Sequence, residues 1–230
     1  MPDLRQRSRL PEMMDGDDVS QDDFAACMAD LATVNTVTLA RGPTLRFVAE
    51  AVAQTPDVLT VLDVGFGAGD MLRSIAAMLQ RQGRHARLIG IDLNPRSEAA
   101  ARAHTAADLS IDWRTGDYAD LGGEGWDFVI SSLVAHHMTR SQLIAFLRFM
   151  AQEARVGWLV NDLHRHGFAY HGWPLLAGLF GWHLIVRHDG RLSIARSYRP
   201  AEWQPLLKDA GIDDARVFRA FPFRLCVASR

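Results

Sequence analysis

A glycine-rich loop between two acidic residues is the segment of this sequence whose residue types and spacing most directly indicate chemistry. The segment VLDVGFGAGD spans residues 61–70 and places Gly65, Gly67 and Gly69 at alternate positions after Asp63. Glycine lets the backbone turn tightly and approach a ligand closely, and a helix that starts behind such a loop adds N–H donors and the positive end of its dipole. An apolar run precedes the loop and helical periodicity follows it, so we expect a strand–loop–helix unit of the kind that binds nucleotide-like ligands.

The spacing of the glycines separates the candidate ligands. A dinucleotide-binding loop has the pattern G-x-G-x-x-G, whereas here the third glycine comes one residue early and Asp70 takes the last position of that pattern. No G-K-[ST] sequence follows, which excludes the phosphate loop of nucleoside-triphosphate binders. The pattern is therefore D-x-G-x-G-x-G, and a nicotinamide-dependent oxidoreductase stays an alternative that Asp70 disfavours.

Two further acids follow apolar segments downstream of the loop. Asp92 lies in GIDLNP at the end of the second expected strand, and Asp117 lies in GDYADL after the third, with Tyr118 beside it as an aromatic stacking face. A carboxylate has two acceptor oxygens and can hold both hydroxyls of a vicinal diol. Open α/β sheets bind ligands at the carboxyl ends of their strands, so both acids are candidate ligand-binding residues.

Histidines follow the fourth and fifth expected strands. The segment SSLVAHHMT contains His136 and His137, and NDLHRHGFAYH contains His164 and His166. The unperturbed pKa of histidine, about 6.5, leaves the ring largely neutral and able to accept a proton at about pH 7–8. A neutral imidazole can therefore act as a general base toward a weakly acidic hydroxyl group.

Short apolar runs alternate with helical periodicity through the middle of the chain, which predicts a largely parallel sheet with helices on both faces. The expected strands are 59–64, 87–93, 109–114, 126–132 and 156–163, and the expected helices between them are 70–82, 95–104 and 141–154. A helix at 200–209 with Gly211 as its C-cap follows. Strands at 214–220 and 223–228 have no crossover helix between them, so they should form an antiparallel hairpin and complete a seven-stranded sheet.

The N-terminal region is expected to consist of a poorly ordered segment and helices. Residues 1–19 are polar and should be poorly ordered, whereas Ser20 is a candidate N-cap of a first helix. A second amphipathic helix should start at Leu45 and end before Pro56. We therefore divide the chain into an N-terminal unit, residues 1–56, and a ligand-binding domain, residues 57–230.

A segment without Asp, Glu, Lys or Arg follows the fifth expected strand. Residues 168–186 are long enough, at about 19 residues, to suggest a membrane span. Both flanks belong to the same sheet, however, and glycines and Pro174 interrupt the segment. We expect an insertion over residues 168–198 that covers an apolar pocket, with no transmembrane span and at most a weak association with a membrane surface.

Composition excludes several classes of function. The chain has 230 residues, 48% of them hydrophobic, and a formal net charge of −2, which is ordinary for one globular domain and gives no basic patch for nucleic acid. Cys27 and Cys226 form neither a metal-type pair nor a disulfide framework. Residues 1–11 lack the apolar stretch of a signal peptide, so we expect a cytoplasmic protein.

From about Val58 to its C-terminus the chain resembles the class I S-adenosylmethionine (SAM)-dependent methyltransferases, which have a Rossmann-like fold with a closing antiparallel hairpin. The resemblance implies SAM as cofactor. It implies that the glycine loop surrounds the methionine part of SAM, that Asp92 binds the ribose and that Asp117 binds the adenine amine. The cofactor-binding residues expected on this basis are Asp63, Gly65, Gly67, Gly69, Asp92, Leu93, Asp117, Tyr118 and Ser131.

The resemblance also implies roles around the methyl acceptor. His136 matches the general base of plant-type phenolic O-methyltransferases, and His137 is the second catalytic candidate. The candidate substrate-binding residues are His164, His166, Tyr170 and Trp173. Metal-dependent catechol-type members use an acid after strand four and an Asp-Asn pair after strand five. Here those positions hold Ser131-Ser132 and the reversed pair Asn161-Asp162, so we expect no catalytic metal.

The acceptor is expected to be a small lipophilic molecule. No Asn-Pro-Pro-Tyr motif follows strand four, which disfavours methylation of nucleic-acid amines. The aromatic insertion suits an apolar pocket, so the expected reaction is O-methylation of a phenolic, quinol or polyketide-like hydroxyl in secondary metabolism. C-methylation of an activated ring and a SAM-binding protein without catalysis stay open as alternatives, and the sequence leaves the oligomeric state undetermined.

Overall fold

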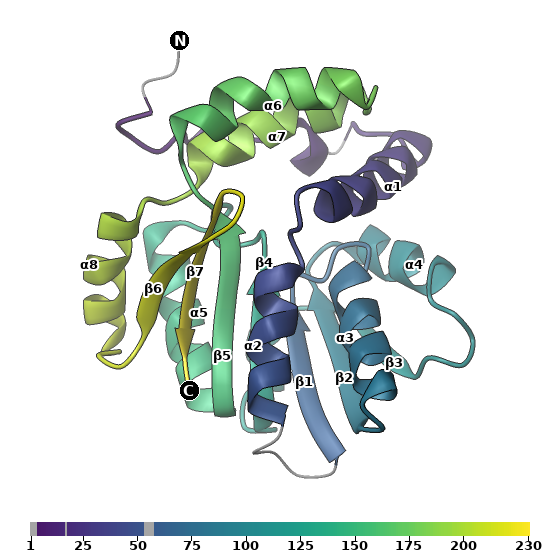
Figure 1. The fold of residues 1–230 in the computed structure, drawn as a ribbon, viewed down its shortest axis with the longest axis vertical. Coiled ribbons are helices and arrows are strands. Elements are labelled where there is room, and N and C mark those ends of the chain that lie inside the picture. The colour runs from purple at the N-terminus through teal and green to yellow at the C-terminus, as the bar shows by residue number, and fades with distance from the viewer. Residues whose placement is uncertain (1–3, 17, 53–57) are drawn as a thin grey trace.

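The protein forms a seven-stranded sheet with the strand order β3-β2-β1-β4-β5-β7-β6 (Figure 1). The computed structural model describes residues 4–16, 18–52 and 58–230. The strands are β1 (Val58–Val64), β2 (His85–Asp92), β3 (Ile111–Thr115), β4 (Trp126–Ser132), β5 (Ala154–Leu163), β6 (Arg216–Ala220) and β7 (Arg224–Ser229). The first five strands pair in parallel, and β7 pairs antiparallel with both β5 and β6. The predicted Rossmann-like fold with a closing hairpin is therefore confirmed.

Helices cover both faces of the sheet. One face packs against α2 (Gly42–Val52), α3 (Asp70–Arg81) and α4 (Pro95–Ala103), and the other against α5 (Arg140–Glu153) and α8 (Pro200–Ala210). The buried central strands β1 and β4 contribute side chains to both cores, as expected for parallel strands covered on both sides. This arrangement fixes the carboxyl ends of the parallel strands at one edge of the sheet.

The predicted elements differ from the observed ones mainly at their ends. The strand at residues 126–132 matches β4 at both ends, and Ser20 caps α1 (Gln21–Val37) by accepting a hydrogen bond from the Asp23 N–H. The second helix begins three residues earlier than expected because Pro43 fits in its first turn, where no N–H partner is required. Its expected end near Pro56, and with it the proposed domain boundary, lies outside the described residues.

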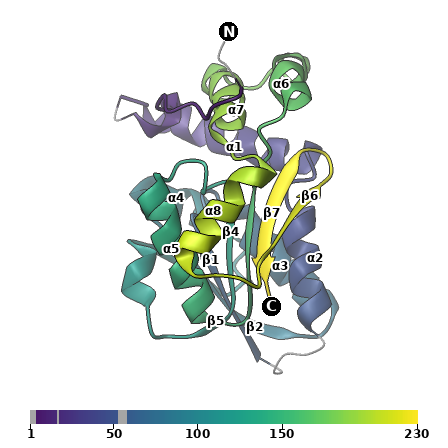
Figure 2. The ribbon, with the colours of Figure 1, turned by 90° about the vertical axis from the view of Figure 1, so that its left-hand side faces the viewer.

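A second layer, the cap, lies over the carboxyl ends of the strands (Figures 1 and 2). It consists of residues 4–16, which contain the short helix η1 (Met13–Asp15), together with α1, α6 (Gly167–Leu179) and α7 (Leu184–Arg196). The cap has its own small core, which includes Cys27, Trp173 and Trp182. The 168–198 insertion thus forms two helices, and none of the described helices is long and apolar enough to cross a membrane.

Residues 4–16 pack against the rest of the protein, in contrast to the poor order expected from their polarity. The backbone N–H of Ser8 donates to the Ala195 carbonyl, and the N–H groups of Met13 and Met14 donate to the buried carboxylate of Asp189. These polar groups find partners on α7. Composition could not reveal the partners because they come from the far end of the sequence.

Candidate active site

A cavity of about 770 Å³ separates the cap from the sheet. Its floor is formed by the loops after β1, β2 and β4, and its other walls by α1, α6 and the turn between β6 and β7. Small-molecule sites typically have volumes of about 300–1,000 Å³. The cavity is therefore large enough for a cofactor and a small second ligand.

The glycine loop after β1 borders this cavity and requires glycine at each of its three positions. Gly65, Gly67 and Gly69 all have positive φ angles, of 76°, 55° and 75°. A Cβ atom would lie 2.3 Å from Val134 at Gly65 and 2.5 Å from Trp113 at Gly69. At Gly67 a Cβ would meet nothing within 4 Å, and this residue lines the cavity. The loop thus brings bare backbone to open space where a ligand can approach.

Asp63, at the end of β1, is a buried carboxylate. It is 1% exposed, and among the described residues neither of its carboxylate oxygens finds a hydrogen-bond donor. Burial raises its pKa well above the ordinary value, and the nearby carboxylates of Asp70 and Asp92 raise the pKa further. An unpaired buried carboxylate is costly, and Asp63 borders the cavity. A cationic donor in the cavity would satisfy it, and the ammonium group of SAM is such a donor.

Asp92 connects the glycine loop to the end of β2. Its Oδ2 accepts the Gly67 N–H at 2.9 Å, and its Oδ1 accepts the Asn94 N–H at 2.9 Å. Burial raises its pKa, whereas the two backbone hydrogen bonds lower it. Each carboxylate oxygen can accept a second hydrogen bond, and Asp92 and Leu93 both line the cavity. The predicted ribose site is therefore sterically available.

Of three further residues predicted to bind the cofactor, Tyr118, Asp117 and Ser131, only Tyr118 lines the cavity. Tyr118 lines the cavity, and its ring packs edge-on against Phe146 and Phe149. Asp117 is exposed, accepts the Ala119 N–H as the cap of the short helix η2 (Tyr118–Leu121), and is not among the lining residues. Ser131 also lies outside the lining, because it is buried and its hydroxyl donates to the Val64 carbonyl between β4 and β1.

The loop after β4 places His136 against a buried acid at the end of β5. The Nδ1 atom of His136 lies 2.7 Å from Oδ1 of Asp162, and its backbone N–H donates to Oδ2 at 2.9 Å. Burial by itself would raise the pKa of Asp162, but the charge of His136 and hydrogen bonds from His136 and Leu163 outweigh burial and lower it. Because Asp162 accepts the Nδ1 proton, the other ring nitrogen, Nε2, is left to face the cavity.

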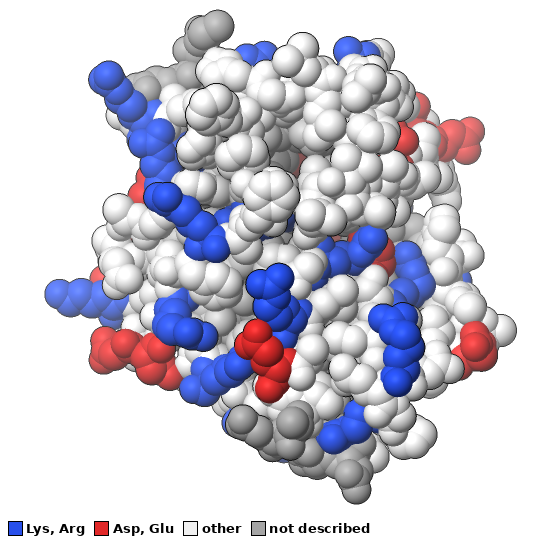
Figure 3. Space-filling view, in the orientation of Figure 1, with Lys and Arg blue, Asp and Glu red and all other residues white. Residues whose placement is uncertain are grey.

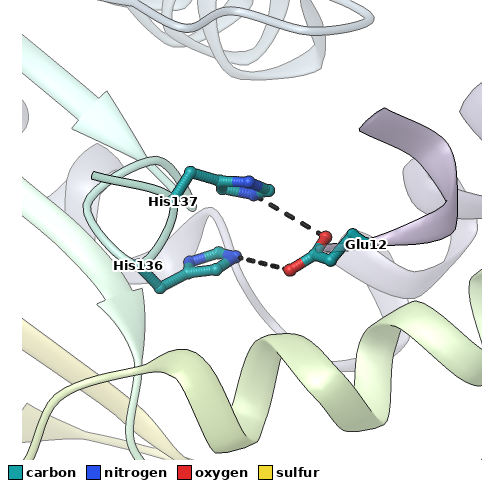
Figure 4. Close-up of side chains that lie close together, drawn as sticks. All are labelled: Glu12, His136 and His137. Atoms are coloured by element: carbon teal, nitrogen blue, oxygen red, sulfur yellow. Dashed lines mark ion pairs between the residues drawn. The ribbon is translucent and has the colours of Figure 1, made fainter. Parts of the chain in front are cut away.

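Glu12, from the N-terminal segment, directs one oxygen at each of the two histidine rings (Figure 4). Its Oε1 lies 3.7 Å from Nε2 of His136 and its Oε2 lies 3.8 Å from Nε2 of His137, which are longer than hydrogen bonds. Burial raises the pKa of Glu12, against the lowering effects of His137, Ser193 and Arg196. All three side chains line the cavity, so a hydroxyl group in the cavity can approach Glu12 and either ring.

The same three side chains have the spacing of a metal-binding cluster. Their ligand atoms all lie within 4.8 Å of one another, a distance that one ion could bridge. Nη1 of Arg196, however, lies 3.5 Å from Oε1 of Glu12 and already supplies positive charge there. The expectation of no catalytic metal stays a prediction.

The predicted substrate residues are separated by the fold. Trp173 lines the cavity, and its indole N–H donates to the Arg187 carbonyl. His164, His166 and Tyr170 are not among the lining residues. His164 is buried beside β7, His166 caps α6 by accepting the Phe168 N–H, and Tyr170 is buried in the core of the cap.

Sequence reasoning missed several residues that the fold brings to the cavity. Glu12 and Asp162 contact His136, and Arg224 on β7 lines the cavity although it is buried. Burial lowers the pKa of Arg224 to about 10. Asp162 carried a detectable signal, since it follows strand five, whereas Glu12 lies in a polar segment with no pattern of its own.

The sheet order, the glycine loop and the acids at the ends of β1 and β2 are the features expected of class I SAM-dependent methyltransferases, which use SAM as cofactor. Residues 61–157 match a family model described as methyltransferase domain. None of the curated protein sequences matches the chain.

Three solved structures of similar fold are distant from this chain in sequence. Human N-acetylserotonin methyltransferase in complex with SAM has 18% identity and a TM-score of 0.63, over 92% of this chain and 56% of that chain. The plantazolicin methyltransferase BpumL in complex with S-adenosylhomocysteine has 15% identity and a TM-score of 0.63, over 92% and 90%. Magnesium protoporphyrin IX methyltransferase from Synechocystis has 19% identity and a TM-score of 0.54, over 83% and 82%. These likenesses establish the fold.

Proposed function

We propose that this protein transfers the methyl group of SAM to a hydroxyl of a small lipophilic acceptor of phenolic, quinol or polyketide-like type. The observation that carries the proposal is the His136–Asp162 pair, which presents a ring nitrogen to the cavity that also borders the glycine loop. Bound SAM would supply a methyl group on a positively charged sulfur and would be converted to S-adenosylhomocysteine. The acceptor hydroxyl oxygen would take the methyl group, and its proton would pass to Nε2 of His136.

The surroundings of His136 suit this role. Proton transfer to Nε2 turns the ring into an imidazolium between the carboxylates of Asp162 and Glu12, at 2.7 and 3.7 Å. Opposite charges at these distances attract each other more strongly in a buried site than in water. His136 is only 3% exposed, so the proton is transferred away from bulk solvent. Asp162 thus orients the base, and both acids stabilise its protonated form.

The lining of the cavity supports a lipophilic acceptor. Apart from the cofactor loops and the Glu12–His136–His137 cluster, the walls are mainly aliphatic and aromatic. Apolar side chains come from α1, with Met28 and Leu31, and from α6, with Trp173 and Leu176. A hydrophilic acceptor would lose hydration against these apolar walls.

The cofactor would occupy the side of the cavity next to the sheet. We assign Asp63 to the ammonium group of SAM, Asp92 to the ribose hydroxyls and Tyr118 to the adenine ring. Asp117 retains its predicted role only if its exposed carboxylate reaches the adenine amine from outside the cavity wall. The methyl group would then face His136 across the cavity.

Calorimetry with SAM and a product assay test the proposal. We expect SAM to bind and its methyl group to appear on an oxygen of alkylated or polycyclic phenols, with little transfer to hydrophilic phenols. Mass spectrometry with fragmentation distinguishes O-methyl from C-methyl products, and a C-methyl product would establish the alternative reaction. Binding of SAM without transfer to any member of the panel would contradict the proposal.

A further inference from the structure

Helix α6 is apolar on both of its sides. Its inner side lines the cavity through Ala169, Trp173 and Leu176. Its outer side exposes a stripe at helical spacing, Phe168, Leu175 and Leu179, which are 79%, 78% and 80% exposed. A surface helix normally turns a polar face to water. With only 13 residues, α6 is too short to cross a bilayer.

The exposed stripe is part of a larger apolar surface. At the C-terminal end of α6 it continues to Phe180 and Leu184, which are 46% and 71% exposed. At the N-terminal end the His166 ring stacks between Phe168 and Phe223, with ring centroids 5.7 and 5.2 Å apart. We call this surface the rim patch, and its members are Phe168, Leu175, Leu179, Phe180, Leu184, Phe221 and Phe223.

The rim patch is continuous with the wall of the cavity. Phe168 and Phe223 belong to both, since they are exposed and also line the cavity. Figure 3 shows that the upper part of this face, where α6 lies in Figure 1, is almost free of charged side chains. An apolar molecule can therefore move between the patch and the cavity along apolar side chains.

Both arginines and acids lie near the rim patch, and the acids on α1, Asp23 and Asp30, are engaged by His183. Arg187 on α7 is exposed, and Arg191 is half-buried over the ring of Tyr170. Asp189, the one acid in α6 and α7, is buried and accepts backbone N–H groups from the N-terminal segment.

An apolar surface flanked by arginines is suited to the interface of a membrane that contains anionic lipids. A twofold dimer formed through the same patch would instead bring two sets of arginines together. We propose that α6 and the β6–β7 turn dock on an anionic membrane surface, and that the acceptor passes from the bilayer into the cavity. The evidence for docking is the rim patch and the charges beside it. The passage of the acceptor from the bilayer rests, in addition, on the proposed function.

Vesicle flotation of the full chain tests the docking. We compare vesicles of phosphatidylcholine alone with vesicles that contain about one quarter phosphatidylglycerol. We expect the protein to float with the anionic vesicles and less with the neutral ones. The double variant Leu175→Ser/Leu179→Ser should bind the anionic vesicles at least about tenfold more weakly, because two leucine side chains no longer enter the interface.

The matched control is Leu10→Ser/Val58→Ser, which removes two exposed apolar side chains outside the patch. It should bind vesicles as the unmodified protein does. Equal vesicle binding by the Leu175/Leu179 variant and the unmodified protein would overturn the proposal. So would a dimer in solution that the same variant converts to monomers, because the patch would then be a subunit interface.

Activity separates this proposal from the proposed function. With an acceptor dispersed in detergent, the Leu175/Leu179 variant should be as active as the unmodified protein, since neither leucine lines the cavity. With the acceptor dissolved in anionic vesicles, its rate should fall by about the same factor as its vesicle binding. Vesicle binding without methyl transfer in either format would contradict the proposed function alone.

Discussion

The two sides of the cavity are assembled from residues at very different distances along the chain. On the side of the sheet, the cofactor loops are fixed by contacts such as that between the Gly67 N–H and Asp92, 25 residues apart. On the side of the cap, Glu12 is held by the hydroxyl of Ser193, 181 residues away. The sheet side is a local strand–loop–helix motif. The cap side forms only when the N-terminal segment packs against α7, which comes from near the other end of the chain.

The two sides of the cavity also differ in the kind of side chains that they present. The sheet side has features that suit a cofactor: positive-φ glycines, a buried carboxylate that finds no hydrogen-bond donor among the described residues and an acid that ties two loops together. The cap side and the loop after β4 hold the groups that can exchange a proton. Variants on the sheet side should therefore weaken cofactor binding, whereas variants of the proton-exchanging groups should lower turnover and leave cofactor binding nearly unchanged.

The largest effect is expected on the chemical side, at His136. General-base catalysis is typically worth about 100- to 10,000-fold in rate, so His136→Ala and His136→Gln should both lower kcat by that order. Glutamine fills much of the space but accepts no proton at neutral pH. Affinity for SAM, measured by calorimetry, should stay nearly unchanged because the cofactor loops are intact.

The matched control is His171→Ala, an exposed histidine on α6. It should retain kcat. If His136→Gln lost less than about threefold in kcat but melted at a lower temperature, His136 would be a packing residue. Positioning alone, or His137, would then account for catalysis.

The same difference between local motifs and long-range contacts decides which parts of the site could be predicted from the sequence. The glycine loop and Asp92 could be proposed as cofactor-binding residues because the proposal depends on local spacing, which a sequence displays. The pairing of His136 with Asp162 depends on β4 and β5 being neighbours, and only the fold shows this. Glu12 was missed because nothing in a polar N-terminal segment indicates which distant side chains it will meet. His164 and His166 were predicted in the site because they follow strand five, but the chain turns there and directs them elsewhere.

The next largest effect is expected on the cofactor side, at Asp92. Loss of a charged hydrogen-bond partner costs about 1.5–3 kcal/mol, so Asp92→Ala should weaken SAM binding roughly 10- to 150-fold. The matched control is Asp112→Ala on β3, which removes an exposed acid paired with Arg114. Unchanged SAM affinity in a folded Asp92→Ala variant would remove the main support for the assigned cofactor site.

A smaller effect is expected at His164, where β5 leaves the sheet for the cap. Burial, and then the charges of Arg219 and His166, lower its pKa to about 4. At pH values below 6.5, the ordinary pKa of histidine, the His164 side chain is protonated in the unfolded chain. In the folded chain it stays neutral until the pH falls to about 4. The free energy of unfolding should therefore fall as the pH decreases from about 6.5 to about 4, by about 2 kcal/mol between pH 7.5 and pH 5.

Urea unfolding at the two pH values measures this difference. His164→Gln should show less of the acid-dependent loss, whereas the exposed control His104→Gln retains His164 and should show all of it. Comparing the two pH values within each variant cancels any constant cost of the substitution. An equal acid loss in His164→Gln and the unmodified protein would mean that groups other than His164 cause the acid sensitivity.

The smallest effect is expected at Glu12, whose carboxylate lies 3.7 Å from the proposed base. Glu12→Gln keeps an oxygen for the Ser193 hydroxyl but removes a charge that would stabilise the protonated ring. Because Arg196 already offsets part of that charge, we expect kcat to fall by only about tenfold, with SAM affinity unchanged. The matched control is Glu50→Gln, an exposed acid paired with Arg230.

Experiments with divalent cations distinguish two roles for His136, that of a general base and that of a ligand to a catalytic metal. If His136 takes the proton directly, a chelator should leave the rate unchanged. Added Zn²⁺ should inhibit, because it would occupy the Nε2 lone pair between the two rings and Glu12. Glu12→Gln should weaken that inhibition, since the cluster loses its anionic ligand, whereas Glu50→Gln should not. If a chelator instead abolished activity and a divalent cation restored it, the cluster would hold a catalytic metal and His136 would be its ligand. A group other than His136 would then have to accept the hydroxyl proton. The cavity would contain a metal site in addition to its cofactor side and its proton-exchanging side.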